Sequence, residues 1–303
     1  MGKVLEDKAV IVSGAAGGIG SAVAAYLARQ GARLVLGDID APAVERLADT
    51  LRSDGFDAVA EAGDVAVWDD CAALVRRSLD RHGRIDGLVQ CAGVVYLAKP
   101  WDEQDGTRAR RLIEVNLIGT YNLGTQVLHR MQQQGHGAIV NVSSGTQAGM
   151  ASGAAYAASK GGVAALTYAW AMDAGPQGIR VNALSPVATS AMTRTTDQYL
   201  RAHGQLQGER PYVDPASNAP AVAFLLSDAA RAFNGQILRV HGEQVQLMSH
   251  PAVMLPVLSR ETWDVDGLAQ ALDASFAGSL PPLGITGIEA RFVPLAKTNQ
   301  VPR

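Results

Sequence analysis

Short apolar runs alternate with helical stretches along most of this chain, and that alternation limits its fold more than any other feature. Runs such as Ala9-Val10-Ile11-Val12 lack the alternation of polar residues that marks a half-exposed strand. Helical stretches such as Ala154–Ala174 separate the runs. Strands that are buried on both faces and joined by helices form a parallel sheet. The sequence therefore predicts an α/β fold with a single doubly wound (Rossmann) domain, a seven-stranded parallel sheet and ligands at the carboxyl ends of the strands.

The expected elements follow one another at regular intervals. The expected strands are residues 8–13, 33–38, 57–62, 87–90, 137–144, 178–184 and 236–240. The expected helices are residues 18–30, 41–53, 68–81, 107–133, 154–174, 215–226 and 265–276. The chain after Val240 is rich in proline and too short to build a large core of its own. We therefore expect a Rossmann-fold domain at residues 1–249 and a C-terminal extension at residues 250–303, packed on that domain or on a neighbouring subunit.

Composition excludes several classes of protein. The 303 residues are 48% hydrophobic and carry a net charge of −3, which argues against a nucleic-acid or membrane-surface partner. No apolar run is long enough to span a membrane, and the first residues do not resemble a signal peptide. The six histidines have no metal-ligand spacing, so no metal site is expected. With Cys71 and Cys91 interpreted as free thiols, these features predict a cytoplasmic protein.

Three glycines follow the first strand and open the first helix. At Gly14, Gly18 and Gly20 the backbone can approach a pyrophosphate, which the helix N-terminus attracts. Asp38 ends the second strand, where its carboxylate could accept hydrogen bonds from an adenosine ribose and repel the 2′-phosphate of NADP. The alternative for the three glycines is a plain tight turn, and the alternative for Asp38 is a solvated acid in a loop. Asp64 could touch the adenine or serve as a turn acid. Together these residues favour NAD as the cofactor.

Tyr156 and Lys160 lie four residues apart, on one face of a predicted helix. Free tyrosine has a pKa near 10, so a phenolate base at neutral pH requires a depression of about 3 units, or about 4 kcal/mol. A nearby ammonium and a cationic nicotinamide could supply it. Two serines, Ser143 and Ser144, come about a dozen residues earlier at a strand end. A dinucleotide site beside a proton-transfer pair indicates hydride transfer.

These motifs together resemble the short-chain dehydrogenase/reductase family over residues 5–245. The matching positions are Ser13-Gly14, Gly18-Ile19-Gly20, Asp64, Ala92-Gly93, Asn116, Ser143-Ser144, Tyr156, Lys160 and Arg180-Val181-Asn182. The resemblance implies that Tyr156 is the general acid/base, that Lys160 lowers its pKa, and that Asn116 holds a relay water. It also implies that a serine polarises the substrate oxygen. Cofactor contacts are further implied for Gly14, Gly18, Ile19, Gly20, Asp38, Asp64, Val65, Ala92, Gly93, Tyr156, Lys160, Val187 and Thr189.

Several positions depart from the family pattern. Gln90-Cys91 replaces two asparagines before Ala92, which puts a sheet-bracing contact in doubt. A serine-to-tyrosine spacing of thirteen would select Ser143, whereas the strand end selects Ser144, which we prefer. The loop after the sixth strand and the tail loosely resemble the dehydrogenase domains of peroxisomal multifunctional enzymes, which act on hydroxyacyl-CoA and 17β-hydroxysteroids.

The sequence thus predicts an NAD-dependent dehydrogenase that interconverts a secondary alcohol and a ketone on an apolar small-molecule substrate, as a homotetramer or dimer. The alternatives are an epimerase or dehydratase that retains NAD, and a regulator that binds NAD without chemistry. The intact set of serine, tyrosine, lysine and asparagine argues against the regulator.

Overall fold

A computed structural model describes residues 3–280 and residue 284. Its strands are β1 (Ala9–Ser13), β2 (Arg33–Asp38), β3 (Ala58–Ala62), β4 (Gly87–Gln90), β5 (Gly137–Val142), β6 (Ile179–Val187), β7 (Ile237–His241) and β8 (Gln244–Leu247). Its α-helices are α1 (Gly18–Arg29), α2 (Ala41–Ser53), α3 (Trp68–His82), α4 (Thr107–Ile113), α5 (Gly119–Gln134), α6 (Ala154–Ala174), α7 (Ala191–Ala202), α8 (Ala219–Leu226) and α9 (Val265–Phe276). The sequence did not indicate α7.

The strands form one sheet in the order β3-β2-β1-β4-β5-β6-β7-β8. Strands β1 to β7 are parallel, which confirms the doubly wound α/β fold. The sheet has eight strands rather than the expected seven, because β8 pairs antiparallel with β7. A two-residue turn with Gly242 at φ 58° makes this hairpin. The strand was missed because its four residues are too few for a clear pattern.

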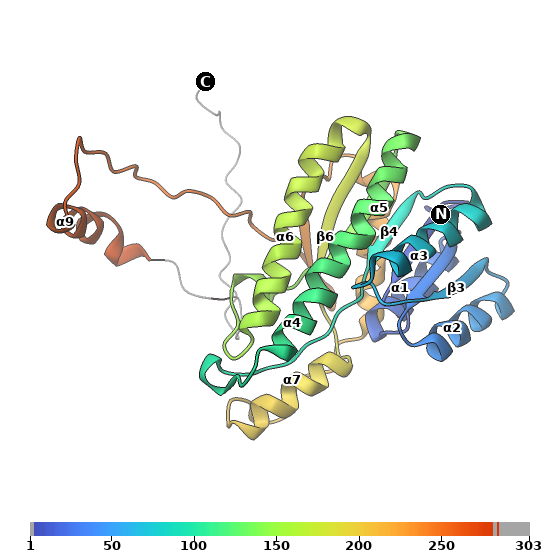
Figure 1. The fold of residues 1–303 in the computed structure, drawn as a ribbon, viewed down its shortest axis with the longest axis horizontal. Coiled ribbons are helices and arrows are strands. Elements are labelled where there is room, and N and C mark those ends of the chain that lie inside the picture. Colours follow the sequence, from blue (N-terminus) through green and yellow to red (C-terminus); the bar gives the residue numbers. More distant parts are fainter. Residues whose placement is uncertain (1–2, 281–283, 285–303) are drawn as a thin grey trace.

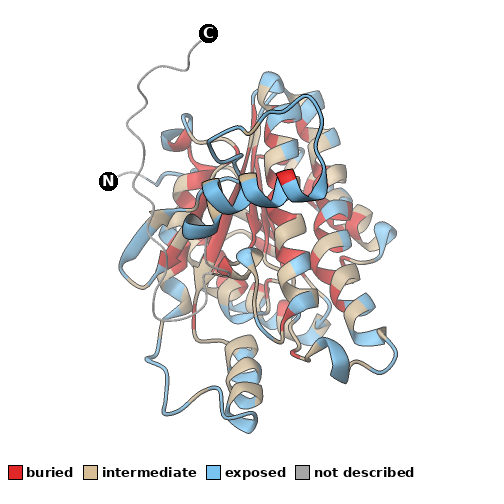
Figure 2. Ribbon diagram, turned by 90° about the vertical axis from the view of Figure 1, so that its left-hand side faces the viewer, coloured by how far each residue is buried: buried red, intermediate tan, exposed pale blue. Residues whose placement is uncertain are grey.

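Helices cover both faces of the sheet, and each face has its own core (Figure 1). Val10 and Val12 of β1 point into a cluster that includes residues of α1, α2 and α8. Ile11, between them, points into a second cluster with residues of α3, α5 and α6. Figure 2 shows the buried strands between helices whose outer faces are exposed. This double coverage is the reason that the strands read as continuous apolar runs.

The chain reverses its winding direction between β1 and β4. In a doubly wound sheet, ligands bind at the carboxyl ends of the strands beside such a point. The glycine-rich loop follows β1 and Cys91-Ala92-Gly93 follows β4, so both line this crevice. No helix in the described part of the chain is long and apolar enough to cross a membrane.

Candidate active site

The glycine-rich loop is shaped by two close backbone approaches. Gly14 has φ 67°, and a Cβ there would lie 2.4 Å from the backbone N of Ala92, which is closer than atoms can pack. A Cβ at Gly20 would lie 2.1 Å from the carbonyl oxygen of Gly14. Only glycine fits either position without moving backbone. The loop therefore lies directly against the end of β4 and turns tightly into α1.

The start of α1 fits a dinucleotide. Gly17 is the N-cap of α1 and no side chain caps the helix, so its first N–H groups are available to an anion. Gly17 and Gly18 are exposed. At the end of β2, the carboxylate of Asp38 accepts hydrogen bonds from the backbone N–H groups of Ala16 (2.9 Å) and Asp40 (3.0 Å). These contacts hold a carboxylate beside the glycine-rich loop.

Tyr156 and Lys160 stand one turn apart in α6. The Nζ of Lys160 lies 5.9 Å from the centre of the Tyr156 ring, and it donates a hydrogen bond of 2.7 Å to the carbonyl oxygen of Val142 at the end of β5. Lys160 is 4% exposed. A Cβ placed on Gly93 would lie 3.7 Å from this Nζ. The lysine therefore joins the end of β5 to the crevice beyond β4.

Asn116 lies in a π-helical turn, residues Glu114–Ile118, between α4 and α5. Its amide is paired with the backbone of Val94: Oδ1 accepts from the N–H at 2.7 Å and Nδ2 donates to the carbonyl at 2.9 Å. Nδ2 also lies 3.1 Å from Oγ of Ser159 in α6. Turns of this kind are frequent at functional sites. The turn brings Asn116 to the segment after β4 and to the helix of Tyr156.

The two serines differ in what they face. The hydroxyl of Ser143 is buried and lies 2.7 Å from Oε1 of Gln147 and 3.0 Å from the carbonyl oxygen of Lys160. The hydroxyl of Ser144 accepts a bond from the N–H of Thr146 at 3.2 Å, and it is near enough to the hydroxyl of Tyr156 to lower the pKa of that phenol by hydrogen bonding. Only Ser144 is thus directed at the tyrosine hydroxyl.

Burial shifts three ionisation equilibria in this site. It lowers the pKa of Lys160 to about 8, opposed by the nearby thiol of Cys91. It raises the pKa of that thiol to about 12, although the ammonium of Lys160 acts in the opposite direction. Burial also raises the pKa of Tyr156, and this outweighs the hydrogen bond with Ser144. The structure therefore raises the pKa of Tyr156, whereas the resemblance implied that Lys160 lowers it.

The remaining expected cofactor residues lie around the same crevice. Asp64 is a turn acid: Oδ1 accepts from the N–H of Ala66 at 2.9 Å, and Oδ2 pairs with Arg111 at 2.5 Å. Val65 is buried, and Ile19 is half-buried against the core. The N–H of Thr189 donates to the carbonyl of Val213, and Oγ1 of Thr189 accepts from the N–H of Val213. The carbonyl of Val187 accepts from Nδ2 of Asn218. Within the described residues no group of three or more His, Cys, Asp or Glu could hold a metal ion.

Three further residues lie among the expected site residues. Ser159 bridges Asn116 and the carbonyl of Tyr156, Cys91 lies near Lys160, and a Cβ on Gly93 would lie 3.6 Å from Cε of Met192. Ser159 could have been identified from the sequence, because it directly precedes Lys160. The position of Met192 beside Gly93 depends on how α7 packs next to the segment after β4.

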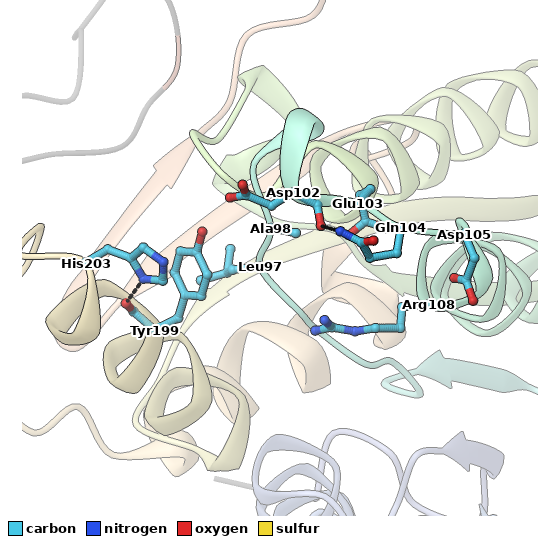
Figure 3. Close-up of a pocket in the computed structure, with 9 residues that line it drawn as sticks. All are labelled: Leu97, Ala98, Asp102, Glu103, Gln104, Asp105, Arg108, Tyr199 and His203. Atoms are coloured by element: carbon cyan, nitrogen blue, oxygen red, sulfur yellow. Dashed lines mark hydrogen bonds between the residues drawn. The ribbon is translucent and has the colours of Figure 1, made fainter.

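Two cavities lie along the segment after β4, and Tyr156 lines neither of them. One, of about 270 Å³, reaches Ala155, the residue before Tyr156. The other, of about 500 Å³, lies between the segment after β4 and α7 (Figure 3). Its lining is mostly polar and comprises Leu97, Ala98, Asp102, Glu103, Gln104, Asp105, Arg108, Tyr199 and His203. The two cavities share Ala98, which pairs with Gly153 just ahead of α6.

Comparison with known proteins places this geometry among its relatives. The sequence pattern of the family described as short chain dehydrogenase matches residues 8–201. A cis-4-hydroxycyclohexanecarboxylate dehydrogenase from Sinomonas cyclohexanicum is 39% identical over 251 residues, which cover 80% of this chain and 98% of that protein. A D-threitol dehydrogenase from Mycolicibacterium smegmatis is 36% identical over 248 residues, 78% of this chain and 93% of that protein.

Solved structures agree with the sequence relatives. The crystal structure of a short chain dehydrogenase from Mycobacterium avium matches with a TM-score of 0.80 at 28% identity, covering 92% of this chain and 98% of that one. An actinorhodin polyketide ketoreductase solved with NADPH matches with a TM-score of 0.74 at 28% identity, covering 80% of this chain and 98% of that one.

Proposed function

Because this chain belongs to the short-chain dehydrogenase family of oxidoreductases, we propose that it interconverts a secondary alcohol and a ketone with NAD as the hydride carrier. The observation that carries the proposal is the meeting of Ser144, Tyr156, Lys160 and Asn116 at the carboxyl ends of β4 and β5, next to the glycine-rich loop. Side chains suited to proton transfer thus lie beside a glycine-rich loop suited to binding a dinucleotide. That is the arrangement that a hydride transfer between cofactor and carbonyl carbon requires.

Each side chain has a distinct part in this chemistry. The hydroxyl of Ser144 donates a hydrogen bond to the substrate oxygen, and the hydroxyl of Tyr156 gives the proton in reduction or takes it in oxidation. Burial raises the pKa of Tyr156 and so favours the protonated phenol, which suits proton donation. When bound, the nicotinamide supplies or accepts the hydride. In oxidation, the ammonium of Lys160 and the positive charge of the oxidised ring would both stabilise a phenolate.

The choice of NAD over NADP rests on Asp38. Its carboxylate lies at the end of β2 and is fixed by two backbone N–H donors. A 2′-phosphate on the adenosine ribose would meet this negative charge, and no arginine pairs with Asp38 among the described residues. Without that phosphate, as in NAD, the carboxylate of Asp38 accepts hydrogen bonds from the hydroxyl groups of the adenosine ribose.

The substrate is expected to have an apolar part beside Tyr156 and a polar part farther out. Met192 lies near Gly93, which is also close to Lys160. Arg108 and the carboxylates of Asp102 and Glu103 line the larger cavity, together with Leu97. The cis-4-hydroxycyclohexanecarboxylate named in one relative has this division, with a ring alcohol and a distant polar group. A steroid or hydroxyacyl thioester with a polar end has the same division. The part of the substrate that carries the reacting carbon is thus the part that we expect to be apolar.

The test is the loss of a single oxygen atom. Tyr156→Phe keeps the ring and removes the proton carrier, so turnover followed by nicotinamide absorbance should fall at least ~100-fold while NAD affinity stays unchanged. Ser144→Ala should lower kcat far more than Ser143→Ala, which serves as the matched control. If the Tyr156 variant keeps more than about a tenth of its activity, the assignment of the acid/base is wrong.

A further inference from the structure

The larger cavity, of about 500 Å³, is lined by two hydrogen-bond donors that have no partner. Arg108 of α4 lies on one side of it and Tyr199 of α7 on the other. The guanidinium of Arg108 makes no hydrogen bond or ion pair among the described residues. The hydroxyl of Tyr199 is buried and has no hydrogen-bond partner there. Both groups therefore have donors that only water or a ligand can satisfy.

Aromatic contacts hold these two donors in place. Cζ of Arg108 lies 4.3 Å from the centre of the Tyr96 ring, so the guanidinium rests on an aromatic face. The ring of Tyr199 stacks on that of His203, with 4.0 Å between their centres. Figure 3 shows the guanidinium turned toward the α7 side of the cavity. Donors that are already positioned lose less conformational entropy when a ligand binds.

The carboxylates in the same lining do not neutralise Arg108. Oδ1 of Asp105 accepts from the N–H of Thr107 at 2.9 Å, just before α4. Oε2 of Glu103 lies 3.5 Å from the hydroxyl of Tyr96. Neither forms an ion pair with Arg108, which is the only arginine or lysine in the described lining. An ammonium ligand would leave the N–H groups of this guanidinium unpaired, whereas a carboxylate accepts two of them side by side.

Two helices lead from this cavity to the crevice. Asn116, which pairs with the segment after β4, follows Arg108 by eight residues. Met192, which lies near Gly93, precedes Tyr199 by seven residues on one side of α7. The segment after β4 runs between α4 and α7 (Figure 1). Seven or eight helical residues span about 10–12 Å, so the cavity lies about that far from the crevice.

The segment after β4 also joins the cavity to the start of α6. Ala98 lines both cavities, and its N–H donates a hydrogen bond of 2.7 Å to the carbonyl of Ser152. The smaller cavity reaches Ala155, the residue before Tyr156. A ligand in the larger cavity is thus near the chain segment that leads into the helix of the acid/base.

We propose that the larger cavity binds a carboxylate of the substrate, held by Arg108 and Tyr199 while the reacting carbon lies beside Tyr156. The guanidinium donates two parallel N–H bonds to the carboxylate, and the phenol of Tyr199 donates a third. The substrate class is a hydroxy acid, or the corresponding keto acid, with roughly a ring and a short chain between its acid and its alcohol. This inference rests on the proposed function and adds the group by which the substrate is selected.

A series of ring alcohols tests the proposal with the full chain and NAD. Each is a 4-hydroxycyclohexane that carries a carboxylate directly or through one or two methylene groups. The matching carboxamides keep the shape and lose the charge. For the most active acid we expect kcat/KM to exceed that of its carboxamide at least ~10-fold. The difference should lie mainly in KM, because the carboxylate contact is made before and during the reaction alike.

Substitutions on α4 and α7 assign this preference to particular side chains. Arg108→Gln should reduce the ratio of acid to carboxamide to less than ~3, and Arg108→Lys should retain part of it, because an ammonium keeps the charge without the planar fork. Tyr199→Phe should reduce the ratio at least ~3-fold. The matched control is Arg110→Gln, which removes an exposed charge from α4 at a residue that lines neither cavity. General damage to the fold lowers both activities and leaves the ratio unchanged.

Titration calorimetry of the same acids measures binding without turnover, so it separates the two proposals. If the chain oxidises none of these alcohols, the proposed function is refuted for them, whereas the carboxylate site still requires that Arg108→Gln raise the Kd at least ~10-fold. Wild-type protein that binds no acid, or binds acid and carboxamide equally, would overturn the inference. Equal effects of Arg108→Gln and Arg110→Gln would do so as well. A preference for the ring alcohol with an aminomethyl group would assign the cavity to a cation held by its carboxylates.

Discussion

Asp38 is the residue at which cofactor choice can be tested most directly. Its two carboxylate oxygens are fixed by the N–H groups of Ala16 and Asp40, so the charge cannot swing away from a 2′-phosphate. We expect kcat/KM to favour NAD over NADP by at least tenfold, which is about 1.4 kcal/mol. Asp38→Ala should narrow that ratio, and Asp40→Ala is the neighbouring control. A wild-type preference for NADP would refute the assignment.

Lys160 is a buried cation that the fold retains at a cost in stability. Its pKa falls from 10.5 to about 8 in the folded chain, so below pH 8 both states carry the proton and folding pays the full penalty. That penalty is about 3 kcal/mol, and it disappears as the pH rises from 8 to above 10.5, where both states are neutral.

Lys160→Met should therefore stabilise the cofactor-free protein near pH 7 by up to about 3 kcal/mol, while abolishing turnover. The gain should shrink steadily between pH 8 and pH 10.5. Urea titrations at a series of pH values measure it. A gain that does not depend on pH would mean that the ammonium is not desolvated as the structure indicates.

At the scale of elements, β4 and β5 are joined by a side-chain bridge that replaces the asparagine contact put in doubt above. Nε2 of Gln90 donates to Oδ1 of Asn141 at 2.9 Å, and Nδ2 of Asn141 donates to Thr167 in α6 at 2.9 Å. Gln90 and Asn141 are buried. The sheet is thus tied to α6, the helix that carries Tyr156 and Lys160, by polar groups of strands and helix.

Gln90→Leu leaves the oxygen of Asn141 buried without its partner, which costs about 1–3 kcal/mol. We expect a lower midpoint in urea and nearly unchanged kcat for the molecules that remain folded. The double variant with Asn141→Leu should lose less than the sum of the two single losses, because the orphaned oxygen is then gone. Additive losses would show that the bridge contributes nothing.

For the whole molecule, the body (residues 3–249) and the described part of the C-terminal extension differ in what stabilises them. The body has a core on each face of the sheet, whereas α9 lies outside both. A chain cut after Ser249 should therefore fold in one cooperative transition and bind NAD with a Kd within about threefold of the full chain. Isothermal titration and thermal melting measure this. An insoluble or unfolded fragment would mean that the extension belongs to the body's core.

The sequence by itself determined those features of the protein that depend on residues close together in the chain. Continuous apolar runs separated by helical stretches predicted the doubly wound sheet, and the fold is confirmed. The glycines at positions 14 and 20 were identified from their place between a strand and a helix, and the structure gives them their steric reason. Tyr156 and Lys160 could be paired because an interval of four places two residues on one side of a helix.

Only the tertiary structure decided how distant segments meet. It brought Asn116 to α6 through a π-helical turn and let Gln90 reach Asn141. It also showed that β8 adds an antiparallel strand to the sheet and that α9 lies away from the sheet and its covering helices (Figure 1). These contacts depend on the crossing of helices over the sheet and on what each surface leaves unpaired. Neither is a property of neighbouring residues, so no spacing in the sequence could reveal it.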